Sequence, residues 1–245
     1  LSLATPWGGL GVAAQGSGNL RNRFDGKLVA RSRQMAGAGC TAQSIRYDGA
    51  VRIRNVRPEF IGPLAAAFIK CEDQKLALEA PEISGKVQFT ETFDRWIGDV
   101  AVQAKSAQSG KRRAEAVAGK LSFNGGLQRT EYKLALSDAA LRMPELQMRK
   151  LAVDAEGSFS FSDSGIALTA RGDASLSGTS LSQSMLPSME QLVRGTKSTP
   201  VGPVVARLDS ALRRAVRSFD GTADFDVAIV PAGNKVSVDR LFIRS

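Results

Sequence analysis

The chain has 245 residues, of which 43% are hydrophobic and 23% are charged, a composition that excludes a disordered protein. Its formal net charge of +9 favours an anionic partner such as nucleic acid, phospholipid headgroups or lipopolysaccharide, without choosing among them. The sequence has no apolar run near the ~20 residues that a membrane-spanning helix needs, and it has no histidine, which excludes His-dependent triads and HExxH zinc sites.

A glycine followed by apolar residues at every second position recurs along the first three quarters of the chain. The copies are Gly26–Ala30, Gly49–Ile53, Gly85–Phe89, Gly119–Phe123 and Gly157–Phe161. Because successive strand side chains point to opposite faces, each copy predicts a strand with one apolar and one polar face. Turn clusters between such segments suit hairpins. The pattern therefore predicts a mainly β fold, an antiparallel up-and-down sheet over residues 1–181.

Individual strands follow from the same alternation and from the residues that interrupt it. We expect Glu59–Ile69 to form one strand, and we expect Leu146–Asp154 and Gly157–Ser162 to form two. The glycines at 49, 85, 119 and 157 are spaced 36, 34 and 38 residues apart, which favours a repeat architecture. The alternative is that similar turn chemistry simply recurs.

Residues 182–219 break the strand pattern. Ser182–Arg194 and Pro203–Ser218 read as two helices, and the second is amphipathic with a basic face. Either the helix packs on the sheet with this basic face in solvent, or the basic face contacts anionic headgroups. The candidate headgroup contacts are Arg207, Arg213, Arg214 and Arg217. Residues 220–245 then predict a returning β-hairpin of the same sheet.

The sequence offers little catalytic chemistry. No set of side chains is selected as a catalytic or metal site, so we expect no enzyme and no cofactor. Cys40 and Cys71 both border predicted strands, and they form either a disulfide or two buried thiols. The basic run Lys111-Arg112-Arg113 lacks interleaved stacking aromatics, so we expect no nucleic-acid partner.

The large apolar side chains collect on one face if the strands align. This predicted lining consists of Leu28, Ala30, Val51, Ile53, Val87, Phe89, Val100, Val102, Leu121, Phe123, Leu134, Leu136, Phe159, Phe161, Ile166, Leu168, Phe225, Val227 and Ile229. Leaving each larger side chain in water costs roughly 1.5–3 kcal/mol relative to burial. A sheet of this size must curl or split. It forms a sandwich that fills itself, or an open trough that acyl chains fill.

These glycine-led strands, together with the turns Tyr47-Asp48-Gly49 and Phe219-Asp220-Gly221 and the insertion over 182–218, resemble the AsmA-like proteins of Gram-negative envelopes. Within them the likeness is to the YdbH type. The resemblance implies a long, curved, taco-like β-groove that conducts phospholipids between the inner and outer membranes. It implies a parent protein anchored in the inner membrane and crossing the periplasm, with this chain as an internal segment that continues at both ends. It also implies a small outer-membrane lipoprotein as a partner that extends the sheet.

A different class of function remains open beside that resemblance. A closed β-sandwich or solenoid would serve as an adhesin or a structural module of the cell envelope. The two interpretations differ in one physical respect, namely whether the apolar face is covered by protein.

Overall fold

The computed structural model describes residues 1–37, 39–73, 75–126, 128–144, 146–162, 165–181, 219–230 and 233–244. The elements in these residues are all strands. Their bounds are β1 (Ser2–Thr5), β2 (Gly8–Asn19), β3 (Arg23–Gly37), β4 (Cys40–Arg54), β5 (Arg57–Ala65), β6 (Phe68–Cys71), β7 (Leu76–Glu79), β8 (Glu82–Phe89), β9 (Arg95–Ser109), β10 (Arg112–Gly126), β11 (Thr130–Arg142), β12 (Leu146–Ser162), β13 (Gly165–Leu181), β14 (Phe219–Val230) and β15 (Gly233–Arg244).

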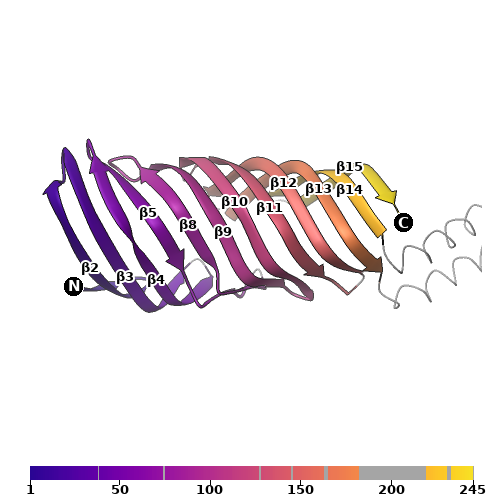
Figure 1. Ribbon diagram of the computed structural model, residues 1–245, viewed down its shortest axis with the longest axis horizontal. Helices are drawn as coiled ribbons and strands as arrows, with labels where there is room; N and C mark the ends of the chain where they lie inside the picture. Colours follow the sequence, from indigo (N-terminus) through magenta and orange to yellow (C-terminus); the bar gives the residue numbers. More distant parts are fainter. Residues whose placement is uncertain are drawn as a thin grey trace, which may run out of the picture.

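The strands form one antiparallel 15-stranded sheet, so the predicted mainly β fold is confirmed. Most strands pair with their neighbours in sequence, which gives the expected up-and-down order. Figure 1 shows them following one another along the long axis, each running obliquely across it. The two helices expected over residues 182–219 lie outside the described residues. Within the described residues, no helix is long and apolar enough to span a bilayer.

Several strands are longer than the alternation predicts. The two strands expected at Leu146–Asp154 and Gly157–Ser162 are one strand, β12. Gly157 lies in its interior, opposite Tyr132 on β11 and Ala170 on β13. The prediction was wrong here because a glycine was read as a strand end, whereas in this sheet it is a paired position within a strand.

Six strands close a ring of pairings in the order β4–β5–β8–β9–β7–β6, a six-stranded barrel in its connectivity that the expected open sheet did not include. Phe68 of β6 and Ala65 of β5 pair with β4 in one register, so β6 continues the line of β5. Strands β7 and β8 likewise pair with β9 in one register, so β7 continues the line of β8. The ring therefore surrounds an interruption at residues 66–67 and 80–81, which splits the strand predicted at Glu59–Ile69.

Left-handed residues mark the level of this interruption on several strands. Ser44 on β4, Ala80 between β7 and β8, and Ala116 on β10 have φ values of 52°, 48° and 53°. A residue with a side chain adopts such values at a cost, and at this level it bends the strand. Register shifts in the β11–β12 and β13–β14 pairs continue the irregularity into the second half of the sheet. The sheet is thus creased along much of its length.

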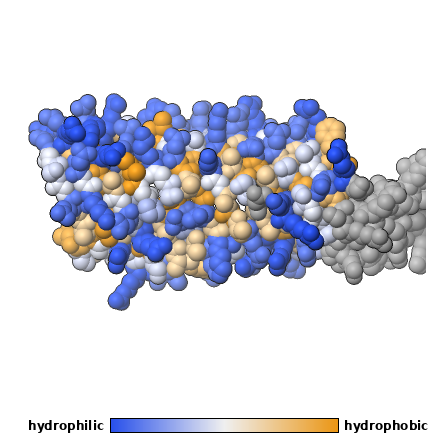
Figure 2. Space-filling view, viewed as in Figure 1, coloured by the Kyte–Doolittle hydropathy of each residue, from blue (hydrophilic) through white to orange (hydrophobic). Residues whose placement is uncertain are grey.

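The sheet has little packed core. Among the described residues the buried hydrophobic side chains are Ala65, Cys71, Val100 and Ala139. Every strand pair with extensive backbone contact is a hydrogen-bonded pair of the same sheet. The described residues therefore form one continuous sheet, and Figure 1 shows fainter segments of it passing behind the front strands. Figure 2 shows hydrophobic residues along the middle of the view and hydrophilic residues at both long edges.

Glycine is required where neighbouring strands approach closely. A Cβ added at Gly49 would fall on the carbonyl oxygen of Ile61 and the hydroxyl of Tyr47. The Tyr47 hydroxyl lies across this glycine and donates to the carbonyls of Ala50 and Ile61 at 3.0 and 3.3 Å. The glycine of the repeated segment therefore leaves space for both the adjacent backbone and an aromatic ring.

We expect Gly49→Ala to lower the free energy of unfolding by about 1–3 kcal/mol, because the added methyl group has no space. Gly9→Ala is the matched control, since a Cβ at Gly9 meets nothing within 4 Å. Urea titrations followed by circular dichroism measure both. Equal midpoints for the two variants would contradict the steric role of Gly49.

Cys40 and Cys71 lie directly opposite one another on β4 and β6 and are joined as a disulfide. The bond ties β4 to the strand segment beyond the interruption, 31 residues along the chain. Closing a loop of this length contributes about 3–4 kcal/mol in the chain-entropy model. We expect the double variant C40S/C71S to lose about that much stability in urea. An unchanged midpoint would show that hydrogen bonding alone holds β6 in place.

Candidate functional site

The described part of the predicted lining lies on one face of the sheet. Leu121 on β10 stands opposite Val100 on β9 and Leu134 on β11, and each of these residues has at least one polar neighbour on its own strand. The same registers align the lining residues of the other strands. Phe161 and Ile166 pair with each other on β12 and β13, and their side chains lie outside the described residues. Lipid contact by this lining remains a prediction.

The sequence analysis left out several aromatic residues that share this apolar face. They are Phe24, Tyr47, Phe60, Trp96 and Tyr132. The signal was available in the same alternation for all but Phe60, because each of the others stands two or four residues from a predicted lining residue on its own strand. These rings were not assigned to the predicted lining because some of them lie outside the glycine-led segments.

Aromatic rings make a continuous run of contacts across the ring of six strands. Tyr47 lies 6.2 Å from Phe60 between ring centroids, and Phe60 lies 5.8 Å from Phe89. Phe89 in turn lies 5.4 Å from Phe93 in the β8–β9 turn. Phe93 is 54% exposed and has a φ of 58°. These aromatic contacts thus extend the apolar face to the rim of the sheet, where the Phe93 ring is exposed to water.

Most large side chains on this face are only half-buried. Leu64, Ile83 and Ile229 are 46%, 43% and 40% exposed. Most of the predicted lining residues are less exposed than these three, and Val100 is buried at 6% exposure. The face therefore retains apolar area that a hydrophobic ligand could cover.

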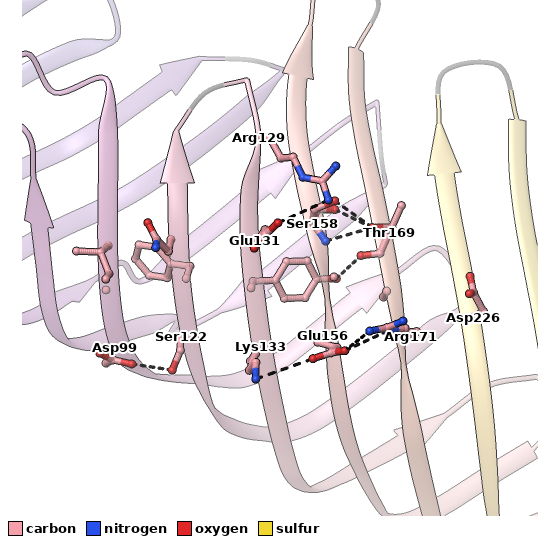
Figure 3. Close-up of a pocket in the computed structure, with 17 residues that line it drawn as sticks. Asp99, Ser122, Arg129, Glu131, Lys133, Glu156, Ser158, Thr169, Arg171 and Asp226 are labelled. Atoms are coloured by element: carbon pink, nitrogen blue, oxygen red, sulfur yellow. Dashed lines mark hydrogen bonds and ion pairs between the residues drawn. The ribbon is translucent and has the colours of Figure 1, made fainter.

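The polar face carries a row of side chains that runs across six strands. Figure 3 shows this row, which consists of Asp99, Ser122, Lys133, Glu156, Arg171 and Asp226. It borders a cavity of about 800 Å³. The backbone of Gly98, Gly157 and Ala170 lies between this row and the next one, so the cavity is a furrow between rows of polar side chains.

Opposite charges alternate along this row. Arg171 donates to Glu156 at 2.6 and 3.0 Å, and Lys133 approaches the other oxygen of that carboxylate at 4.0 Å. The hydrogen bond from Arg171 lowers the pKa of Glu156 and raises that of Arg171. Both groups stay charged near neutral pH and satisfy each other. This arrangement stabilises the solvated face and leaves no activated acid, base or nucleophile in the furrow.

The remaining predicted residues fall into two groups. Cys40 and Cys71 are brought together as the disulfide described above. Arg207, Arg213, Arg214 and Arg217, the candidate headgroup contacts, lie outside the described residues. Among the described residues no group of three or more Cys, Asp or Glu side chains is placed to hold a metal ion.

Comparison with known proteins identifies no relative: no family model, no curated protein and no solved structure matches this chain. The resemblance to AsmA-like proteins therefore rests on the sequence pattern quoted for it.

Stability should fall in acid. Hydrogen bonds from neighbouring side chains lower the pKa values of Asp25, Glu79, Asp94 and Glu156. A carboxyl whose pKa is depressed by folding stabilises the folded state above its unfolded pKa, near 3.8 for Asp and 4.5 for Glu. That contribution is lost as the pH falls through the lower, folded value.

We therefore expect a flat urea midpoint between pH 7 and about 5, and a decline below about 4.5. In Glu156→Gln the decline should be shallower, because one of these carboxyls no longer titrates. A midpoint that is independent of pH down to 3 would show that the hydrogen bonds to these four carboxyls contribute nothing to stability.

Proposed function

We propose that this chain is a segment of a lipid-transfer protein whose apolar sheet face receives the acyl chains of phospholipids. The observation that carries the proposal is the apolar face itself, on which Leu64, Ile83 and Ile229 remain 46%, 43% and 40% exposed. A face of this kind is unfavourable in water unless a ligand covers it. Acyl chains suit it because they match an apolar surface that lacks precisely placed polar groups.

The geometry favours passive movement along the sheet. Val100, Leu121 and Leu134 are successive members of one row that crosses the strands, in the direction of the long axis. Strands lie about 4.8 Å apart, so a bound chain meets a similar apolar residue at each short step. Closely spaced sites of similar affinity keep the barriers between them low. Polar headgroups would remain in water at the rim.

The wider setting is part of the same proposal. We infer a curved groove that crosses the periplasm, within a parent protein anchored in the inner membrane and extended by a small outer-membrane lipoprotein. The disulfide between Cys40 and Cys71 supports an oxidising compartment of this kind. The resemblance to AsmA-like proteins supports phospholipid as the cargo.

A charge placed on the apolar face tests the proposal. We expect Leu121→Asp to remove phospholipid that co-purifies with the protein, as measured by mass spectrometry of extracted lipid. The matched control is Ala118→Asp, which adds the same charge to the exposed polar face of the same strand. A buried, unpaired carboxylate beside an acyl chain costs several kcal/mol, so lipid recovery should fall at least tenfold only in the first variant.

Circular dichroism establishes that both variants are folded, and Leu121→Asn serves if the charged variant unfolds. Full lipid recovery in a folded Leu121 variant would overturn the proposal. A wild-type protein that purifies free of lipid and takes up none from vesicles would favour the structural module of the cell envelope instead.

A further inference from the structure

Three arginines stand directly opposite one another on adjacent strands. Arg54 near the end of β4 pairs with Arg23 on β3 and with Arg57 on β5. We call Arg23, Arg54 and Arg57 the arginine row. Like charges in directly opposed positions destabilise a sheet. A row of three therefore needs negative charge nearby.

The protein supplies little of that charge. Asp25 accepts a hydrogen bond from Arg54 at 2.6 Å and lies 3.5 Å from Arg23. The same carboxylate also lies 3.8 Å from Arg52 in the next row. Arg57 has no ion-pair partner among the described residues, and neither has the side chain of Arg21 in the adjacent β2–β3 turn. One carboxylate thus serves several guanidinium groups, and two of the arginines are left for an external anion.

Arg54, at the centre of the arginine row, is held in a defined position. It also donates to the carbonyls of Phe24 and Ile53 at 3.0 and 2.9 Å, so its guanidinium is fixed at one end by these carbonyls and at the other by Asp25. Ordered guanidinium groups lose less entropy when they bind an anion than free ones do. The centre of the row is therefore arranged in advance for an oxyanion.

The two turns beside the row are locked together. The backbone N–H groups of Asn55 and Val56 donate to Asn22 and Arg21 at 2.9 and 3.0 Å. Asn55 and Val56 have φ values of 48° and 56°, and such a value is costly for a β-branched valine. Surrounding contacts must maintain this strained turn, and strain of this kind gathers at binding sites. The turn places Arg57 and Arg21 at the same rim.

The apolar face begins immediately beside the row. Phe24 and Ile53 alternate with Arg23 and Arg54 along their strands and point to the opposite face. Leu20, in the adjoining turn, is 62% exposed. A ligand that carries an anionic group and a hydrocarbon chain could bind the arginines on one side of the rim and the apolar side chains on the other.

We propose that the arginine row, together with Arg21, binds the phosphate group of a phospholipid whose acyl chain lies on the apolar face of the same strands. This inference rests on the proposed function and assigns the headgroup a site. Guanidinium groups bind phosphate through paired N–H donors, which an ammonium group cannot reproduce. The site would hold a lipid at the N-terminal end of the described sheet.

The test uses the full chain and two probes that share a tail, dodecyl phosphate and the uncharged dodecyl maltoside, in calorimetric titrations. R21Q/R57Q removes the two arginines that have no ion pair. We expect dodecyl phosphate to bind about 25-fold more weakly, at about fivefold per arginine, while the affinity for dodecyl maltoside is unchanged. R21K/R57K should lose less, because it keeps the charge and removes only the paired donors.

The matched control is K111Q/R112Q, which removes two positive charges from the β9–β10 hairpin. Equal weakening by both glutamine variants would overturn the site, because it would reduce the effect to general charge. Inorganic phosphate that binds as tightly as dodecyl phosphate would overturn a lipid ligand in favour of a free anion. Tighter binding of a short RNA, lost in R21Q/R57Q, would overturn it in favour of nucleic acid.

Val51→Asp, on the apolar face of β4 beside the arginine row, separates this inference from the proposed function. If Val51→Asp loses dodecyl phosphate and R21Q/R57Q does not, the headgroup site is wrong and the apolar face still binds lipid. If only R21Q/R57Q loses it, the arginines bind an anion and the proposed function is wrong. Loss in both variants supports both. Urea midpoints equal to the wild type establish that the arginine variants are folded.

Discussion

Hydrogen bonding between long neighbouring strands holds this protein together, because there is almost no packed interior to do so. The buried hydrophobic residues of the described chain are few, and three of the four are as small as Ala65, Cys71 and Ala139. Each strand depends on the two that flank it. Stability in such a molecule is close to a sum of nearest-neighbour terms, as in repeat proteins. An apolar face can then remain open without unfolding the chain.

The same dependence on strand pairing explains the glycines and the crease. A sheet bends sharply where side chains are absent or where the backbone becomes irregular. Gly49 and Gly157 allow adjacent strands to approach, and tyrosine rings lie across both. The left-handed residues Ser44 and Ala116 bend the strands at another level. The disulfide secures the segment where two strands are broken.

Charge is arranged differently in two parts of the polar face. Between β9 and β14 opposite charges alternate across the strands, so Glu156 and Arg171 neutralise each other. Near the β4–β5 turn, by contrast, arginines stand in direct register around Asp25. The first arrangement leaves these charges paired with one another. The second leaves positive potential at the rim of the apolar face, where the headgroup of an acyl-chain ligand would lie.

Alternation along the sequence was enough to predict a mainly β fold and the up-and-down order of its strands. It sufficed because the two-residue period of a strand is a local property, visible within Leu121–Phe123 or Val100–Val102 alone. Register is not local, because it depends on which distant residues pair. The tertiary structure alone therefore decided that Arg54 stands between Arg23 and Arg57, and that Cys40 bonds to Cys71. It also joined two expected strands into β12 and broke another at residues 66–67, because a glycine or alanine has the same local pattern inside a strand as at its end.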